Sequence, residues 1–441
     1  MAKIGILTTF ASFNPWYSLT GIVKDQARML REHGHEVFIF VNEQFAGSEA
    51  DFPGVTLLRE VPFTHLHDYQ SNEPLKNEHH ITAHELAKRL TARLPELGIS
   101  IVLTHDIAFT GWNKPYAIGL QRIGNSLPDI MWFHWIHSIP TRFSDWWRLD
   151  AYGSNHKLVY PNKSDALRVA ENYRTSLNNI VVIPHIKDIR VMFDFPKEAC
   201  DIIAAYPALM QADIVQVYPA SSDRFTAKRV AEVIRVFGNL KNSGQSVCLF
   251  VANQWATTSK HETDIAQYYR IGESFGLVPG KELIFSSTMD IPGCDYKVGV
   301  PSNVLNYLMM LGNLFVFPTD HETFGLVLPE ASLASGALCV LNRSLLMQIE
   351  VGGHNGLYFD FGSYTNQTHI PDPGSYFRDM ANIILRKMHT DAGIATRTFM
   401  RKSYNYDRLY RDYYGPIIST ALAAINGSTA TQGAQTPEEL H

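Results

Sequence analysis

Short apolar runs alternate along the chain with longer segments in which apolar residues recur every three or four positions. Runs of this kind predict strands buried in a parallel sheet, and the longer spacing predicts amphipathic helices. In the first half, the predicted strands are Lys3–Thr9, His35–Val41, Ile99–Thr104, Asp129–Trp135, Leu158–Pro161 and Ile180–Pro184, and the predicted helices are Ile22–His33, His79–Leu97 and Lys163–Arg174. The alternation favours a doubly wound α/β sheet.

The regular alternation fades around Lys187–Tyr206 and then begins again. The second series comprises a helix at Ala227–Leu240 and strands at Ile214–Tyr218, Ser246–Ala252, Leu283–Ser286, Leu314–Pro318, Leu338–Leu341 and Leu357–Phe361. We therefore predict two doubly wound, Rossmann-like domains, residues 1–190 and 191–403, that face a ligand-binding cleft. The small polar residues at 427–441 predict a disordered tail.

Composition narrows the class of protein. The 441 residues are enough for two cores, and 45% apolar with 18% charged residues is typical of a globular protein. A net charge of -5 argues against a wholly basic surface that coats nucleic acid. The four cysteines form no CxxC pair, so we expect them to be reduced. Without a signal-like start or a long apolar run, we expect a cytoplasmic protein with no transmembrane segment.

The segment Pro318–Gly336 (PTDHETFGLVLPEASLASG) carries the strongest chemical pattern. A buried strand ends in a polar loop, and the loop leads into a helix start that contains Gly325. Free backbone amides and the helix dipole at such a start suit a diphosphate, and glycine lets the backbone approach it closely. Glu322 and Glu330 would lie about 12 Å apart along a helix, and carboxylates accept hydrogen bonds from sugar hydroxyls. The segment therefore predicts a site for a sugar–diphosphate–nucleoside molecule.

The stretch HETFGLVLPEA resembles the E-x7-E element of retaining GT-B glycosyltransferases, especially glycosyltransferase family 4. The resemblance implies that Glu322 contacts the donor sugar and Glu330 the ribose. It also implies that the diphosphate binds along the residues that follow Glu322, namely Thr323, Phe324, Gly325 and Leu326. A nucleotide-diphosphate sugar, with UDP-sugar favoured, is then the donor substrate, and neither a tightly bound metal nor another cofactor is expected.

Two further stretches resemble the same family in order and place. After the strand VQVYP, the segment ASSDRFTAKR lies where the family has an arginine and a lysine that neutralise the leaving diphosphate. Arg224 and Lys228 match these residues, with Arg229 as a competitor and a solvated basic helix start as the alternative. Tyr17–His35 resembles the first loop and helix, in which a glycine turn faces the donor phosphate. Gly21 is the match, although the second glycine common in the family is absent.

A histidine is the remaining candidate for the site. Phe133–His137 (FHWIH) ends a predicted strand where the family often has a histidine near the reacting sugar. The resemblance favours His134, whose neutral imidazole can hydrogen-bond a sugar hydroxyl. His137 and His105 remain alternatives, as does a histidine that is simply packed among aromatic residues. The residues expected to act in catalysis are thus His134, Glu322, Lys228 and Arg224.

The last helix and two weaker patterns complete the picture. Tyr404–Ile417 resembles the family's C-terminal helix, so we expect residues 404–426 to cross back onto the first domain. His79, His80 and His84 include a pair spaced for zinc on one helix face, but no third ligand is evident and no metal site is predicted. The aromatic residues of Trp132–Trp147 are expected in a core, with an acceptor contact as the alternative.

The resemblance therefore implies a hexosyl- or pentosyltransferase that retains anomeric configuration. The acceptor stays open among a glycan, a lipid, a small molecule and a nucleic acid, and the oligomeric state is not indicated. Two alternatives remain: a non-catalytic GT-B protein that binds sugar nucleotides, and a GT-B enzyme that glycosylates modified DNA bases.

Overall fold

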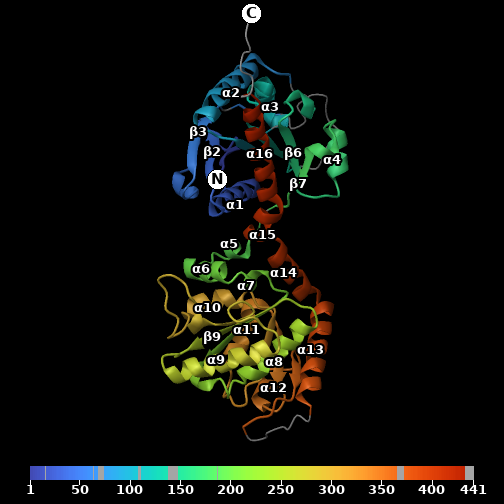
Figure 1. The fold of residues 1–441 in the computed structure, drawn as a ribbon. Coiled ribbons are helices and arrows are strands. Elements are labelled where there is room, and N and C mark those ends of the chain that lie inside the picture. The colour runs from blue at the N-terminus through green and yellow to red at the C-terminus, as the bar shows by residue number, and fades with distance from the viewer. Residues whose placement is uncertain are drawn as a thin grey trace, which may run out of the picture. The chain divides into compact units, whose positions relative to one another are not determined.

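The computed structural model describes residues 1–432 except residues 15, 63, 68–73, 108–110, 138–147, 186 and 365–371. The chain separates into two compact units (Figure 1). The first unit comprises Met1–Lys187 together with the chain from Tyr406 onward, and the second comprises Asp188–Asn405. No helix in the described part of the chain is both long and apolar enough to cross a lipid bilayer.

The first unit is built on a parallel seven-stranded sheet with strand order β3-β2-β1-β4-β5-β6-β7. The strands β1, β2, β4, β5 and β6 are buried on both faces, which accounts for their continuous apolar runs in the sequence. They are β1 (Lys3–Leu7), β2 (Glu36–Asn42), β3 (Thr56–Val61), β4 (Ile101–His105), β5 (Met131–Trp135), β6 (His156–Tyr160) and β7 (Ile180–Val182). The helices are α1 (Ser18–Glu32), α2 (Asn77–Glu96), α3 (Lys114–Ile123) and α4 (Ala166–Asn172).

The C-terminal part of the chain packs on this first unit. It consists of α15 (Tyr406–Leu409), a π-helical turn (Tyr410–Tyr414) and α16 (Gly415–Gln432). Gln26 on α1 donates a hydrogen bond to the Tyr414 hydroxyl (3.0 Å), and the Tyr414 ring stacks on Trp135. Because α16 continues to Gln432, the first part of the predicted disordered tail, residues 427–432, is helical; residues 433–441 lie outside the described residues.

The second unit contains two parallel three-stranded sheets, with orders β10-β9-β8 and β11-β12-β13. The strands are β8 (Ile214–Ser221), β9 (Val247–Gln254), β10 (Leu283–Phe285), β11 (Leu314–Phe317), β12 (Leu338–Asn342) and β13 (Leu357–Phe359). The buried Gln216 side chain joins β8 to β11, since its amide donates to the carbonyl of Val316 and accepts from the N–H of Val316, each at 2.9 Å. The resulting order, β10-β9-β8-β11-β12-β13, is that of a doubly wound, Rossmann-like fold.

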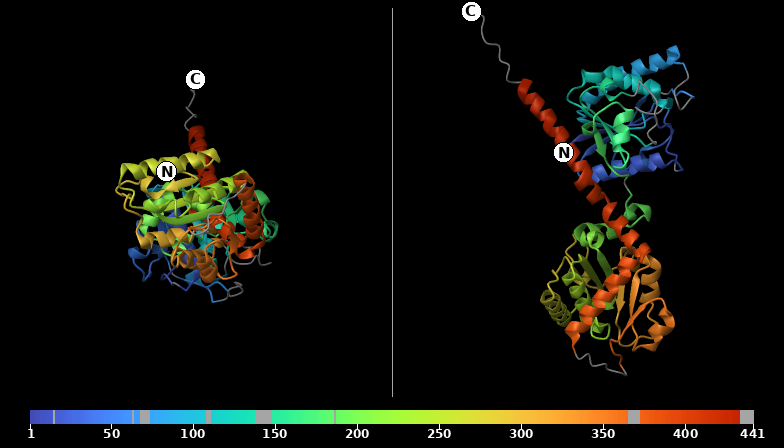
Figure 2. Two further views of the ribbon diagram at one scale, coloured as in Figure 1. Left: turned by 90° about the horizontal axis from the view of Figure 1, so that it is seen from below. Right: turned by 90° about the vertical axis from the view of Figure 1, so that its right-hand side faces the viewer.

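Helices flank the strands of the second unit, as the side view in Figure 2 shows. Helix α8 (Val230–Asn242) packs against α9 (Ser259–Ser274) and α13 (Pro373–Thr390), and α10 (Ser302–Met309) packs against α6 (Lys197–Ala205) and α11 (Val327–Ser335). The remaining helices are α5 (Ile189–Met192), α7 (Ala208–Gln211), α12 (Leu346–Gly352) and α14 (Ala392–Ser403). The predicted fold class, an α/β protein with two doubly wound, Rossmann-like units, is confirmed.

Some elements differ from the prediction. Helix α1 begins at Ser18, four positions before the predicted Ile22, because Leu19 and Thr20 are buried and continue its core-facing side. Strand β3 and helix α3 of the first unit were not predicted, and neither were helices α5, α6, α7, α9, α10, α12, α13 and α14 of the second unit. The charged residues of β3 (TLLREV) break the apolar run that marks the other strands.

Candidate functional site

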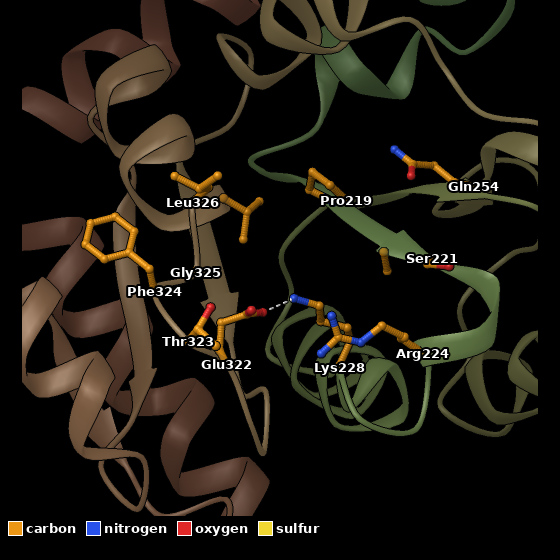
Figure 3. A pocket seen from close by; sticks show the side chains of 12 residues that line it. Pro219, Ser221, Arg224, Lys228, Gln254, Glu322, Thr323, Phe324, Gly325 and Leu326 are labelled. Carbon is orange, nitrogen blue, oxygen red and sulfur yellow. Dashed lines mark hydrogen bonds and ion pairs between the residues drawn. The ribbon is translucent and has the colours of Figure 1, made fainter.

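A pocket of about 490 Å³ opens at the carboxyl ends of β8 and β11 in the second unit (Figure 3). The strand order reverses between these two strands, which is where doubly wound sheets bind ligands. The pocket is lined by Pro219, Ala220, Ser221, Arg224, Lys228, Gln254, Glu322, Thr323, Phe324, Gly325, Leu326 and Val327.

The basic side of the pocket follows strand β8. After Ser221 the chain makes a short 3-10 turn, Ser222–Arg224, and reaches α8 at Val230. The N–H of Lys228 donates to the carbonyl of Arg224 (2.7 Å), and the Tyr218 hydroxyl donates to the carbonyl of Lys228 (2.7 Å). These backbone contacts place both basic side chains on the same wall of the pocket.

The competing residue Arg229 lies elsewhere. Its backbone is left-handed (φ 52°), and its guanidinium lies near Glu232 (3.7 Å) and Asp320 (3.9 Å). Arg229 is therefore part of a separate charge cluster, whereas Arg224 and Lys228 line the pocket.

A buried asparagine anchors the turn that carries Arg224. The Asn253 side chain near the end of β9 is fully buried and donates to the hydroxyls of Ser222 (3.1 Å) and Ser287 (2.8 Å). Its side-chain oxygen accepts the N–H of Ser287 (3.0 Å). These hydrogen bonds connect the loops that follow β8 and β10 to β9, and they stabilise the turn that carries Arg224.

The acidic side of the pocket is the loop between β11 and α11. Gly325 has φ 73°, and a Cβ there would lie 3.0 Å from the Phe317 ring and 3.3 Å from the Glu322 side chain, so only glycine fits without strain. Within the described part of the chain, the N–H groups of Phe324, Gly325 and Leu326 have no hydrogen-bond acceptor. A run of unpaired amides next to a helix N-terminus attracts an anion.

Backbone contacts between the two loops bring acid and base together. The carbonyl of Ala227 accepts the N–H of Asp320 (3.0 Å) and the hydroxyl of Thr319 (3.2 Å). Lys228 directly follows Ala227, and Glu322 lies two residues after Asp320. The two side chains form an ion pair with 2.5 Å between Nζ and Oε2 (Figure 3). Burial raises the pKa of the Glu322 carboxyl, but the hydrogen bond and charge of Lys228 outweigh it and hold that pKa below its ordinary value.

Glu330 is not part of this lining. It is exposed on α11, one turn beyond the helix start. Because α11 begins only at Val327, the residues between Glu322 and Glu330 are not all helical, and the helical spacing does not apply to the pair.

The structure corrects the assignment of His134. Its side chain is fully buried in the core of the first unit, where Nδ1 lies 2.9 Å from the Thr104 hydroxyl and Nε2 lies 2.9 Å from Nδ1 of His156. Burial lowers the pKa of His134 well below its usual value. With no exposed surface and both nitrogens paired, His134 packs the sheet and has no surface to offer a sugar.

The two alternative histidines form a second cluster in the first unit. Nδ1 of His105 lies 2.9 Å from Nε2 of His137, and Nε2 of His105 lies 2.8 Å from the amide oxygen of Gln26. His137 stacks on His185, with ring centroids 5.1 Å apart. Of the three candidates, His105 and His134 are buried, and His137 alone is partly exposed.

Gly21 and His79 lie in the first turns of α1 and α2, respectively. Gly21 lies inside the first turn of α1, not in a turn before it, and a Cβ there would have no heavy atom within 4 Å. Nδ1 of His79 accepts the N–H of Lys76 (3.0 Å) at the start of α2. Among the described residues, no three His, Cys, Asp or Glu side chains are grouped so as to hold a metal ion.

The sequence analysis missed one wall of the pocket. Ser221 and Gln254 pair in register as the last residues of the neighbouring strands β8 and β9. Their position just beyond the carboxyl ends of the predicted strands Ile214–Tyr218 and Ser246–Ala252 was the signal that could have identified them. Pro219, Ala220 and Val327 complete the part of the lining that was not predicted.

No protein-family model and no curated protein sequence matches the chain. Several solved structures are similar at low identity. A glycosyltransferase from Rickettsia africae is 14% identical over 96% of this chain and 98% of its own, with a TM-score of 0.37. Sucrose-phosphate synthase from Thermosynechococcus elongatus is 15% identical over 96% and 100%, with a TM-score of 0.35. HepE from Anabaena, in complex with UDP and glucose, is 13% identical over 95% and 100%, with a TM-score of 0.33.

Proposed function

We propose that this protein is a glycosyltransferase of the GT-B class that transfers a sugar from a nucleotide-diphosphate donor, with UDP-sugar as the expected donor. The observation that carries the proposal is the convergence of Arg224, Lys228, the unpaired amides at Gly325 and the Glu322 carboxylate on one pocket at the strand-order reversal. Two cations and free amides suit a diphosphate, and a carboxylate suits sugar hydroxyls.

In this proposal the positive side of the pocket stabilises the leaving group. Arg224 offers a planar fork to phosphate oxygens, and Lys228 offers a point charge. Both face the position where negative charge develops when the bond between the anomeric carbon and the phosphate oxygen breaks. The diphosphate is then neutralised by side chains and amides, so we expect no requirement for a divalent metal.

We further propose that transfer retains anomeric configuration by front-face attack. The acceptor oxygen bonds to the anomeric carbon as the phosphate leaves, and the acceptor proton passes to a phosphate oxygen. The pocket lining holds one carboxylate, Glu322, and Lys228 pairs with it. A carboxylate so engaged is poorly suited to act as a nucleophile, which favours this route over a covalent intermediate.

The acceptor is expected on the first unit. The carboxyl ends of its parallel strands are the usual ligand-binding edge of such a sheet, and His137 lies there. Neutral imidazoles suit hydroxyl groups better than anionic groups. Burial lowers the pKa of His137 to about 3, so it is neutral at physiological pH.

Isothermal titration calorimetry with UDP, ADP and GDP, in buffer containing EDTA, tests the proposal. We expect at least one of them to bind, and we expect Lys228→Met and Arg224→Gln each to weaken binding about tenfold or more, because each removes a phosphate contact. Arg229→Gln is the matched control, since Arg229 lies outside the lining, and it should bind as wild type does. If wild type binds none of the three nucleoside diphosphates, or if Lys228→Met and Arg224→Gln bind as tightly as the Arg229→Gln control, the pocket is not a diphosphate site.

Binding alone does not separate an enzyme from a sugar-nucleotide-binding protein. We therefore expect release of the nucleoside diphosphate from the corresponding glucose nucleotide, slowly with water and faster with an acceptor. Binding without any such release would favour the non-catalytic alternative.

A further inference from the structure

Glu322 occupies an unusual place for an acidic residue, next to the predicted position of a diphosphate. Its side chain is 15% exposed and that of Lys228 is 11% exposed, and their charged atoms are 2.5 Å apart. The Lys228 ammonium also lies 5.3 Å from the centroid of the Phe317 ring, which confines it on another side. The strongest partner of Lys228 in the described part of the structure is therefore a carboxylate of the same pocket.

The charges in the lining are few enough to count. Among the described residues of the lining, Arg224 and Lys228 contribute two positive charges and Glu322 contributes one negative charge. The net charge of the lining is therefore one positive charge. A sugar nucleotide has two negative charges on its diphosphate. The nucleoside diphosphate left after transfer has roughly three near pH 7.5, since the second ionisation of a terminal phosphate has a pKa of about 6.

These charges act differently on donor and product. In the donor, the sugar separates Glu322 from part of the phosphate charge and gives its carboxylate hydroxyl groups to bind. After transfer, the sugar has gone, the phosphate has gained charge, and the Glu322 carboxylate again competes for the Lys228 ammonium. Like charges in a partly buried pocket are weakly screened.

On the basis of the proposed function, we propose that Glu322 expels the nucleoside diphosphate product by competing with it for Lys228, and so makes the pocket discriminate between donor and product. The Glu322–Lys228 ion pair thus has two tasks. It holds the carboxylate ready for the sugar, and it re-forms as the product leaves.

The test compares Glu322→Gln with wild type by calorimetry, using whichever of UDP, ADP and GDP binds wild type most tightly and the corresponding glucose nucleotide. Glutamine keeps the shape and removes the charge. We expect the variant to bind the nucleoside diphosphate about tenfold more tightly, because removing one unit charge from such a site has an effect of this size. The increase in affinity for the glucose nucleotide should be smaller. The dissociation constant of the nucleoside diphosphate should therefore fall relative to that of the glucose nucleotide.

Two further variants separate this effect from its alternatives. In the double variant Glu322→Gln/Lys228→Met the gain should disappear, because no ammonium remains to be released. Glu350→Gln removes an exposed carboxylate on α12 outside the lining and should leave both dissociation constants unchanged, which controls for net charge. In assays of transfer, Glu322→Gln should also show stronger inhibition by the nucleoside diphosphate.

The outcomes are distinguishable. If wild type binds none of the three nucleoside diphosphates, the proposed function itself is contradicted. If wild type binds one of them but Glu322→Gln binds it equally or more weakly, the role in product release is contradicted and the diphosphate site stands. If Glu322→Gln unfolds, Lys228→Met decides. It leaves the Glu322 carboxylate without its partner and should weaken binding of the more highly charged product more than binding of the donor, and equal weakening of both would contradict the role in product release.

Discussion

Gly325 holds the backbone between β11 and α11 in a conformation that other residues rarely adopt. Gly325 has φ 73°, and a Cβ there would lie only 3.0 Å from the Phe317 ring. The absence of a side chain therefore lets the backbone at Gly325 lie close to the side chains of Phe317 and Glu322. The unpaired amides of Phe324, Gly325 and Leu326 follow from the same geometry. The capacity of the loop to bind an anion thus depends on a single residue without a side chain.

Gly325→Ala is therefore expected to affect both stability and binding. Left-handed backbone strain and the close contact should lower the free energy of unfolding by about 1–3 kcal/mol, and displaced amides should weaken nucleoside diphosphate binding. Gly336→Ala is the matched control, because Gly336 has φ 62° with nothing within 4 Å of a Cβ. It should show backbone strain alone. Urea denaturation and calorimetry measure the two effects, and unchanged binding in Gly325→Ala would contradict this role for the loop.

Strands and their order were largely predictable, because strands buried on both faces appear as unbroken apolar runs. The same property explains the error at His134. In β5 (MWFHW) four of the five side chains are buried, so no alternation indicates which residue reaches the sheet edge. The partners of His134, Thr104 and His156, lie on β4 and β6, and only the folded sheet brings them together.

The pocket was predictable where its residues follow a strand end and carry charge, as with Arg224, Lys228 and Glu322. Their pairing was not, because it depends on Ala227, whose carbonyl links the two loops through backbone contacts. Gln254 and Ser221 have side chains that are common on any surface, and their role in the lining appears only from strand register.

Across the whole molecule, buried histidines are concentrated in the first unit. Burial lowers the pKa values of His137 and His156 to about 3, and those of His105, His134 and His185 also lie below the ordinary value. These side chains are neutral in the folded state and bind protons on unfolding below pH about 6.5.

The first unit should therefore lose stability in mild acid. The contribution is fully present above pH about 6.5 and is lost as pH falls towards 3, and the loss at pH 5 amounts to about 2 kcal/mol for each of His137 and His156. Asp106, whose pKa burial raises to about 6, acts in the opposite direction and offsets about 1 kcal/mol. Hydrogen exchange at pH 7 and pH 5, corrected for intrinsic rates, measures each unit separately. His156→Gln should reduce the dependence of the first unit on pH, and an unchanged dependence in this variant would contradict the assignment.

The most direct test of the central claim is a crystal structure of the protein with a nucleoside diphosphate bound, chosen from UDP, ADP and GDP by calorimetry. The account predicts diphosphate oxygens within hydrogen-bonding distance of the Lys228 ammonium, the Arg224 guanidinium and the amides at Gly325 and Leu326. An ordered nucleotide whose phosphates lie away from these groups would contradict it.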